Sequence, residues 1–171
     1  MTAEGKPARL GADAIARLRE IGLFGGLTDE VLNEFGGALD VIELPPGETV
    51  FREGDSGREM FVVLEGEMEI LRHSKKNHEA RVAILGPGDW FGEMSILDIM
   101  PRSATVRVIA PSRMLRLTTQ DLDALYRRDL KSYSLIVLNI AREISRRLRV
   151  ADGLLAELVA NVMDEYTRPR R

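Results

Sequence analysis

The chain has 171 residues, a formal net charge of −3 and no cysteine. This length suits one domain with a well-filled core rather than two independent domains. The slightly acidic balance does not indicate a general nucleic-acid binder, and the lack of cysteine excludes disulfides, thiolate chemistry and sulfur-ligated zinc. The N-terminus has no apolar signal core, and the near-apolar stretch SLIVLNIA is too short to span a bilayer. The sequence therefore predicts a cytoplasmic protein.

Two short helices are expected near the N-terminus. Residues 1–9 are small and polar and are predicted to be flexible. The stretch ADAIARLREIGLF then places apolar residues at roughly helical spacing. The second helix is expected in LTDEVLNEFGGAL, where Thr28 is suited to be the N-cap and two acids follow it in the first turn.

A series of short strands is expected from Val41 to Leu117. Runs of β-branched and aromatic residues alternate there with turn sequences such as PPGE, EGDSG and GPGDW. Residues 60–64 are apolar on both faces, which predicts a central strand. The pattern predicts an α+β, mainly β fold: an antiparallel β-roll, like a jelly-roll barrel, flanked by N-terminal helices and a long C-terminal helix.

The long helix is expected from about Lys131 to Met163, after a shorter one in TTQDLDALYRRD. Apolar residues recur along it at steps of three and four. They are Val137, Ile140, Ile144, Leu148, Ala151, Leu155, Leu158 and Val162. Either the whole stripe packs on the domain's own core, or its distal part pairs with the same helix of a second copy. The second interpretation is favoured because the distal part extends beyond the reach of a small barrel.

Three features resemble enzyme or metal sites but have simpler explanations. GDSG around Ser56 resembles a serine nucleophile loop, yet a tight turn explains it, since a triad needs a positioned base. His73 and His78 flank a polar turn, and two histidines without a third ligand make a poor metal site. Alternating glutamates are expected on the solvated face of an edge strand, namely Glu65, Glu67 and Glu69. The sequence predicts neither an enzyme nor a bound cofactor.

The stretch FGEMSILDIMPRSATVRV places charged and hydroxyl side chains between apolar residues. A helix that starts near Gly92 would present free backbone amides to an anion. Arg102 can grip a phosphodiester through two donors, and Ser103 and Ala104 add a hydroxyl and an unobstructed amide. Glu93 suits a sugar hydroxyl. The pattern describes a site for a small nucleotide, with a Glu93–Arg102 salt bridge on a loop as the equally weighted alternative.

The motifs PPGETVFREGDSGREMFVVLEGEMEI, GPGDWFGEMSIL and PRSATVRV resemble the cyclic nucleotide-binding domain of catabolite activator protein and of protein kinase A regulatory subunits. The resemblance runs from about Leu18 to at least Tyr126. It implies a cyclic nucleotide whose ribose 2′-OH is held by Glu93 and whose phosphate is held by Arg102. The ligand-binding residues so implied are Gly92, Glu93, Met94, Ser95, Arg102, Ser103 and Ala104.

The resemblance implies a regulatory sensor for cyclic AMP, with cyclic GMP as the other expected ligand. Residues 10–130 would form the nucleotide-binding domain, 131–165 a lid or dimerisation helix, and 166–171 a flexible basic tail. Because little chain follows the helix, the expected output is an unidentified protein partner rather than DNA or a membrane. Ala151 and Asp152 replace two hydroxyl residues that contact the base in catabolite activator protein, so base selectivity stays open. The alternatives are a constitutive dimerisation scaffold or a sensor for cyclic GMP or cyclic di-GMP.

Overall fold

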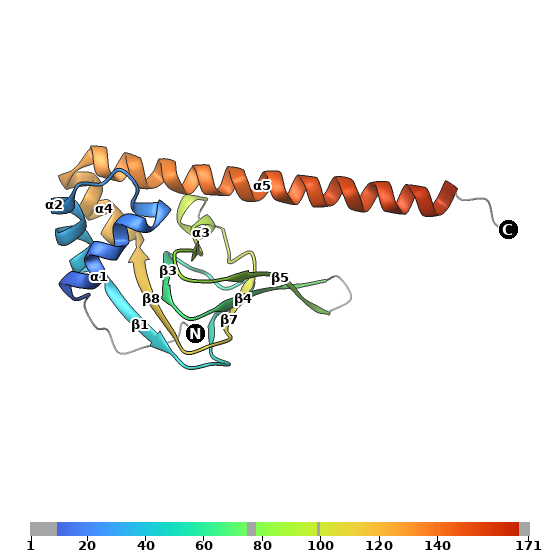
Figure 1. Cartoon of the computed structure of the whole chain (residues 1–171), viewed down its shortest axis with the longest axis horizontal. Coiled ribbons are helices and arrows are strands. Elements are labelled where there is room, and N and C mark those ends of the chain that lie inside the picture. The colour runs from blue at the N-terminus through green and yellow to red at the C-terminus, as the bar shows by residue number, and fades with distance from the viewer. Residues whose placement is uncertain (1–9, 75–77, 99, 168–171) are drawn as a thin grey trace.

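The computed structural model describes residues 10–74, 78–98 and 100–167. A β-roll lies beneath one long helix, and the short N-terminal helices lie at one end of both (Figure 1). The helices are α1 Ala12–Arg17, η1 Leu18–Glu20, η2 Gly22–Phe24, α2 Asp29–Val31, η3 Leu32–Gly36, α3 Met94–Leu97, α4 Thr119–Arg128 and α5 Leu130–Thr167. The strands are β1 Asp40–Leu44, β2 Thr49–Phe51, β3 Glu59–Glu65, β4 Met68–His73, β5 Glu79–Leu85, β6 Trp90–Phe91, β7 Thr105–Val108 and β8 Ser112–Thr118.

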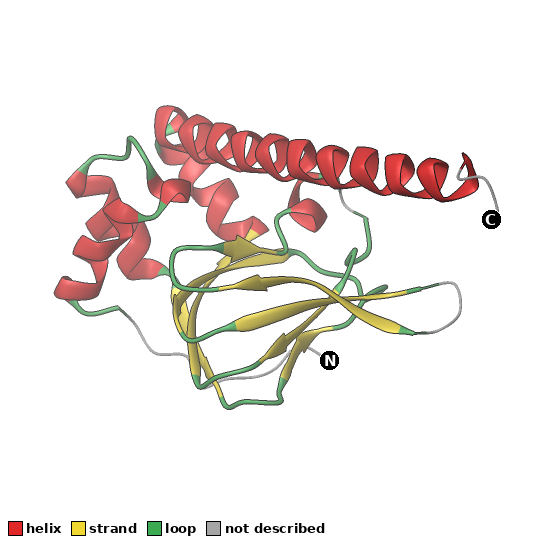
Figure 2. Ribbon diagram, turned by 45° about the vertical axis from the view of Figure 1, so that its right-hand side comes forward, coloured by secondary structure: helices red, strands yellow, loops and turns green. Residues whose placement is uncertain are grey.

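Within the described residues, the strands form two four-stranded antiparallel sheets. Their orders are β1-β8-β3-β6 and β2-β7-β4-β5, and Figure 2 shows them curled into a roll below α5. The predicted antiparallel β-roll with flanking helices is therefore confirmed. The prediction that residues 60–64 form a central strand is also confirmed, because β3 lies between β8 and β6.

Two buried apolar clusters meet at β3. Phe61 and Val63 point into the roll, where they join a cluster that includes Phe51 and Phe91. Met60 and Val62 point the other way, into a cluster that the helices share. Because successive side chains of a strand point to opposite faces, β3 is buried on both. This strand therefore fixes the helices against the roll that carries the site.

The three alternating glutamates do not share one strand, so that prediction was wrong. Glu65 ends β3 and Glu69 lies in β4. Between them Gly66 adopts a φ of +91°, a left-handed conformation that glycine accepts readily and that lets the chain reverse. The Glu69 carboxylate accepts a hydrogen bond from Arg107 Nε at 2.7 Å on the neighbouring strand β7. The sequence pattern missed the turn because Gly66 sits inside an otherwise strand-like run.

The histidines lie on either side of the β4–β5 turn. His73 ends β4, and the carbonyl of His78 accepts a hydrogen bond from the Ser74 amide at 2.9 Å. In the described part of the chain, no group of three or more histidine or acidic side chains is arranged to hold a metal ion. None of the described helices is both long and apolar enough to cross a membrane.

Helix α5 is anchored at one end and extends past the roll at the other (Figure 1). It begins one residue before and ends two residues after the expected range 131–165. Its first half carries the buried residues Ile136 and Ile140. Its second half is exposed, with Leu155 at 59% and Leu158 at 60%. The interpretation that the whole stripe packs on the domain's own core is therefore wrong. The predicted flexible ends were 1–9 and 166–171. Residues 1–9 and 168–171 lie outside the described residues, whereas residues 166 and 167 belong to α5, so the tail prediction was wrong for these two.

Substituting Asn139→Ala is expected to lower the free energy of unfolding by about 1–3 kcal/mol. The buried side-chain amide donates to the Leu23 carbonyl at 3.1 Å and to the Gly25 carbonyl at 3.0 Å, which ties α5 to η2. The variant leaves both carbonyls without this donor. Urea unfolding measures the change. Ser134→Ala is the control, because the Ser134 hydroxyl is exposed and donates along α5, to the Leu130 carbonyl. Equal effects of both substitutions would contradict the anchoring role.

Candidate functional site

The backbone of Arg102 is fixed to the turn that follows β2. Its amide donates to the Asp55 carbonyl at 2.8 Å, and its carbonyl accepts from the Gly54 amide at 2.9 Å. Gly54 has a φ of +87°, and the Asp55 amide donates to the Arg52 carbonyl at 3.1 Å, so the first half of the GDSG motif lies in a tight turn. Pro101 precedes the arginine and restricts the approach of the chain. This turn therefore determines where the guanidinium enters the roll.

The guanidinium of Arg102 is held in the interior by one of its nitrogens. The side chain is 2% exposed. Nη1 donates to the Glu59 carbonyl at 2.7 Å, the Gly92 carbonyl at 3.1 Å and Ser95 Oγ at 2.8 Å. These bonds join β3, the residue before Glu93 and α3 to a single group. Arg102 is thus a fixed part of the roll rather than a surface cation.

Both faces of the Arg102 guanidinium are covered. Its Cζ lies 3.9 Å from the centre of the Phe51 ring, a cation–π contact. A Cβ on Gly57 would lie 2.3 Å from Nε, 2.4 Å from Cζ and 2.7 Å from Nη2. The short distance to Cζ places this point over the guanidinium face rather than beyond its edge. Gly57 therefore covers the face opposite Phe51, and its lack of a side chain leaves room for the guanidinium.

The edge formed by Nε and Nη2 of Arg102 is the part of the guanidinium that can still donate hydrogen bonds to a ligand. Both atoms are buried and have no hydrogen-bond partner among the described residues. Nη2 makes only a longer ion-pair contact, 3.8 Å from Glu59 Oε1. Burial lowers the pKa of Arg102, while the carboxylates of Glu59, Asp55 and Glu93 oppose that shift. The Nε–Nη2 edge has the spacing with which arginine grips two oxygens of a carboxylate or phosphate.

Gly92 is required by conformation and by space. Its φ of +84° lies in the left-handed region, and a Cβ there would approach Arg102 Nη1 to 2.7 Å. The helix does not start at Gly92, as expected from the sequence, but at Met94, and α3 has only four residues. Because the left-handed conformation at Gly92 is not helical, the helix can begin only after it.

Glu93 is buried and is paired with α5. It is 4% exposed, and its Oε1 accepts a hydrogen bond from Arg147 Nη1 at 3.2 Å. Arg147 also donates to the Trp90 carbonyl at 2.8 Å and to Glu143 Oε1 at 3.2 Å. In the described part of the chain, no ion pair joins Glu93 to Arg102, whose carboxylate contact is Glu59. The Glu93–Arg102 salt bridge weighed from the sequence is therefore wrong.

The other predicted residues lie around α3. Ser95 is buried, and its hydroxyl donates to the Gly92 carbonyl at 3.0 Å. The Ser103 hydroxyl contacts Met94 Sδ at 3.6 Å, and both of these side chains are exposed. Ala104 is buried immediately before β7 begins. The structure thus gathers the predicted set, while the roles of Phe51, Gly57 and Arg147 were not foreseen from the sequence.

The free energy of unfolding of the Glu93→Gln variant, relative to that of the wild type, is expected to increase as the pH rises. Burial raises the pKa of Glu93 above its ordinary value, and the Arg147 guanidinium only partly opposes this. The folded protein therefore holds this proton more tightly than the unfolded chain. The stability contributed by the protonated carboxyl is fully present below the unfolded pKa, about 4.3, and is lost as the pH rises through the higher folded value.

Urea unfolding of the wild type and the Glu93→Gln variant at several pH values between 4 and 7 measures this effect. The difference between the two proteins isolates Glu93, because every other group titrates in both. The exposed Glu157, substituted to Gln, is the control for exchanging a carboxylate for an amide at a surface position. If the Glu93→Gln variant instead loses stability relative to the wild type as the pH rises, the ion pair with Arg147 outweighs burial.

The fold and the site together define a ligand-binding β-roll, with a buried arginine edge suited to an oxyanion and a buried carboxylate suited to a hydroxyl. The chain belongs to the cyclic nucleotide-binding domain family. The model of that family matches residues 41–129, which is just over half of the chain. The resemblance seen in the sequence motifs is thereby confirmed.

Relatives of the chain include regulatory proteins. It is 32% identical over 142 residues to the CRP-like cAMP-activated global transcriptional regulator of Mycobacterium tuberculosis, and the match covers 83% of this chain but 62% of the regulator. The chain thus spans less than two thirds of that relative. The crystal structure of Thermus thermophilus catabolite activator protein matches at 35% identity with a TM-score of 0.72, covering 81% of this chain and 63% of the other.

A cyclic nucleotide-binding domain from Methylobacillus flagellatus has a similar fold over nearly its whole length. The match has a TM-score of 0.79 at 23% identity and covers 88% of this chain and 89% of the other. At that level of identity the likeness concerns the fold, which it confirms as a β-roll with flanking helices.

Proposed function

We propose that the chain is a regulatory sensor that binds cyclic AMP beside α3, with cyclic GMP as the alternative ligand. The single observation that carries the proposal is the buried Nε–Nη2 edge of Arg102, which lacks a hydrogen-bond partner among the described residues. A desolvated cation in this state gains most from an anion that supplies two acceptors. The two exocyclic oxygens of a cyclic phosphodiester meet this need with a single negative charge.

Glu93 supplies the second contact of the proposed site. A carboxylate next to a phosphate would repel it, unless it accepts a hydrogen bond from a hydroxyl of the same ligand. The ribose 2′-OH of a cyclic nucleotide is such a donor. Arg147 supports this role, because its guanidinium balances the buried Glu93 charge from α5. Two relatives, a cAMP-activated transcriptional regulator of Mycobacterium tuberculosis and a cyclic AMP receptor protein of Thermus thermophilus, support cyclic AMP as the first ligand to test.

We infer that binding is transmitted to α5. The Glu93–Arg147 ion pair connects the proposed ribose contact directly to that helix. Ile96 in α3 is half-buried against the cluster that contains Ile136 and Ile140 of α5, so a shift of α3 changes the packing of the helix. Leu97, also in α3, is 43% exposed. Couplings of this kind amount to about 1–3 kcal/mol, enough to switch a partner protein.

The distal half of α5 supports a homodimer as part of the proposal. Its exposed apolar residues fall at steps of seven, three and four, which are typical of a coiled-coil seam. These are Leu148, Leu155, Leu158 and Val162, which are 59%, 59%, 60% and 45% exposed. The same surface would also suit the alternative function, a constitutive dimerisation scaffold with a purely structural roll.

Thermal unfolding with a panel of nucleotides separates the two functions. Cyclic AMP, cyclic GMP, 5′-AMP and cyclic di-GMP are added in turn to nucleotide-free protein. A sensor is stabilised by its ligand by about 2.7 kcal/mol at 100 times Kd, which raises the melting temperature. We expect cyclic AMP to raise it, 5′-AMP to leave it unchanged, and Glu93→Gln to reduce the rise. If no nucleotide moves it, the sensor is ruled out and the scaffold is favoured.

A further inference from the structure

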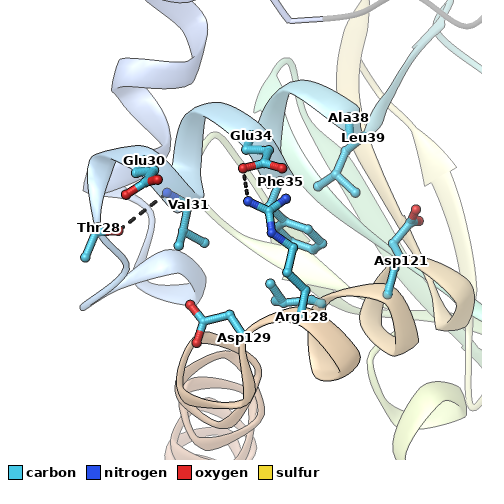
Figure 3. A pocket seen from close by; sticks show the side chains of 12 residues that line it. Thr28, Glu30, Val31, Glu34, Phe35, Ala38, Leu39, Asp121, Arg128 and Asp129 are labelled. Carbon is cyan, nitrogen blue, oxygen red and sulfur yellow. Dashed lines mark hydrogen bonds and ion pairs between the residues drawn. The ribbon is translucent and has the colours of Figure 1, made fainter.

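A concave surface lies away from Arg102, on the helical end of the molecule. It is a groove of about 500 Å³ between α2 with η3 on one side and α4 on the other. Figure 3 shows Phe35 at the middle of this groove, with Arg128 beside it. Val31, Leu39 and Leu125 complete an apolar floor, of which Leu39 and Leu125 are buried. Phe35 and Val31 stay partly exposed.

The rim of this groove is acidic. Glu34 and Arg128 form an ion pair across it and neutralise each other. Of the other described residues that line the groove, those with charges are Glu30, Asp121 and Asp129, all acidic. Asp129 accepts hydrogen bonds from the Ser132 hydroxyl and amide, which lower its pKa and keep it ionised. The groove thus combines an apolar floor with an excess of three negative charges.

We propose that this groove binds a basic amphipathic helix of a partner protein. Two helices with an apolar floor between them form a site into which a third helix can pack at 8–10 Å. The wall formed by α4 has ten residues, or about 15 Å, so two to three turns of a partner helix fit. Apolar residues of that helix would cover Phe35, and flanking arginines or lysines would pair with the rim. An anionic nucleotide is excluded by the same charges.

The inference goes beyond the proposed function, since the groove and the Arg102 site share no lining residue among those described. It rests on the proposed function only where it links the groove to the Arg102 site. Asp129 is the single residue between α4 and α5, so the groove wall continues into the helix that carries Arg147. A partner seated here would contact the part of the chain that nucleotide binding is proposed to move.

The test uses the full chain without nucleotide, so its outcome does not depend on nucleotide binding. Two synthetic 14-residue amphipathic peptides share one leucine pattern and carry either arginine or glutamate at every polar position. Each is titrated into isotope-labelled protein while backbone amide NMR signals are followed. We expect saturable shifts at residues 28–39 and 119–129 with the arginine peptide, and binding at least about 10-fold weaker with the glutamate peptide.

Charge-reversed variants provide the matched control. Glu30→Lys on the rim is expected to weaken binding of the arginine peptide by about 3-fold to 10-fold. Glu157→Lys, also exposed but on distal α5, should leave its affinity unchanged. The proposal is overturned if the shifts are absent, lie outside the groove or respond equally to both variants. It is also overturned if the groove signals shift with protein concentration alone, because the occupant is then a second copy of this chain.

Discussion

Replacing Arg102 by lysine is expected to weaken cyclic nucleotide binding by about 100-fold. Lysine keeps the charge but has no planar edge with two donors, so it cannot reproduce the grip of Nε and Nη2 on a phosphodiester. Losing one charge-assisted hydrogen bond and misplacing the other removes about 3 kcal/mol of binding free energy. Titration calorimetry with cyclic AMP on the variant and the wild type measures this loss.

Two controls separate ligand binding from folding in that experiment. Arg113→Lys is the matched control, because Arg113 is a half-exposed arginine that pairs with Glu43 and Glu65 on the outer face of the sheet. Circular dichroism must show that the Arg102→Lys variant is folded, since Nη1 also supports Glu59, Gly92 and Ser95. If it is not, Glu93→Gln replaces it as the binding variant. If a folded Arg102→Lys variant binds cyclic AMP with wild-type affinity, the assignment of Arg102 as the phosphate contact is wrong.

A double substitution, Leu155→Glu with Leu158→Glu, is expected to convert a homodimer into a monomer. Each leucine is well exposed in the single chain and would be buried in the seam, where it contributes about 1.5–3 kcal/mol. Glutamates facing each other across the seam would add repulsion. Light scattering after gel filtration at micromolar concentration should show half the wild-type mass.

The matched control for the dimer is Glu157→Ala, which changes a neighbouring exposed position off the apolar seam. It should keep the wild-type mass. A wild-type chain that already has the mass of a monomer at this concentration would contradict the dimer. That outcome would leave nucleotide binding untouched, because Arg102 and Glu93 lie within one chain.

Much of the fold could be predicted because its signals are local in sequence. The alternation in β3, the stripe in α5 and the turns around Gly54 depend on residues close to one another. The same holds for helix caps: Thr28 accepts a hydrogen bond from the Val31 amide at 3.4 Å, as its position before two acids predicted. Strand β6 has only two residues, too few for a period, and was missed.

The site could be predicted only in part, because its partners are distant in sequence. Glu93 and Arg102 stand out within one motif, but neither shows which charge it pairs with. Arg147 lies 54 positions from Glu93. Glu143 lies one helical turn before Arg147, so the sequence indicates only an ordinary ion pair along the helix. Gly57 and Phe51 belong to a turn and a strand whose patterns explain them without Arg102. Only the closed roll brings these residues to the same guanidinium.

Titration calorimetry of cyclic AMP and 5′-AMP into wild-type protein tests the nucleotide site most directly. The protein is first unfolded and refolded to remove any bound nucleotide. We expect saturable binding of cyclic AMP at one site per chain and none of 5′-AMP, whose phosphate carries a second charge and is not fixed near the ribose by a ring. No heat from cyclic AMP, cyclic GMP or cyclic di-GMP would mean that Arg102 and Glu93 serve only the structure of the roll.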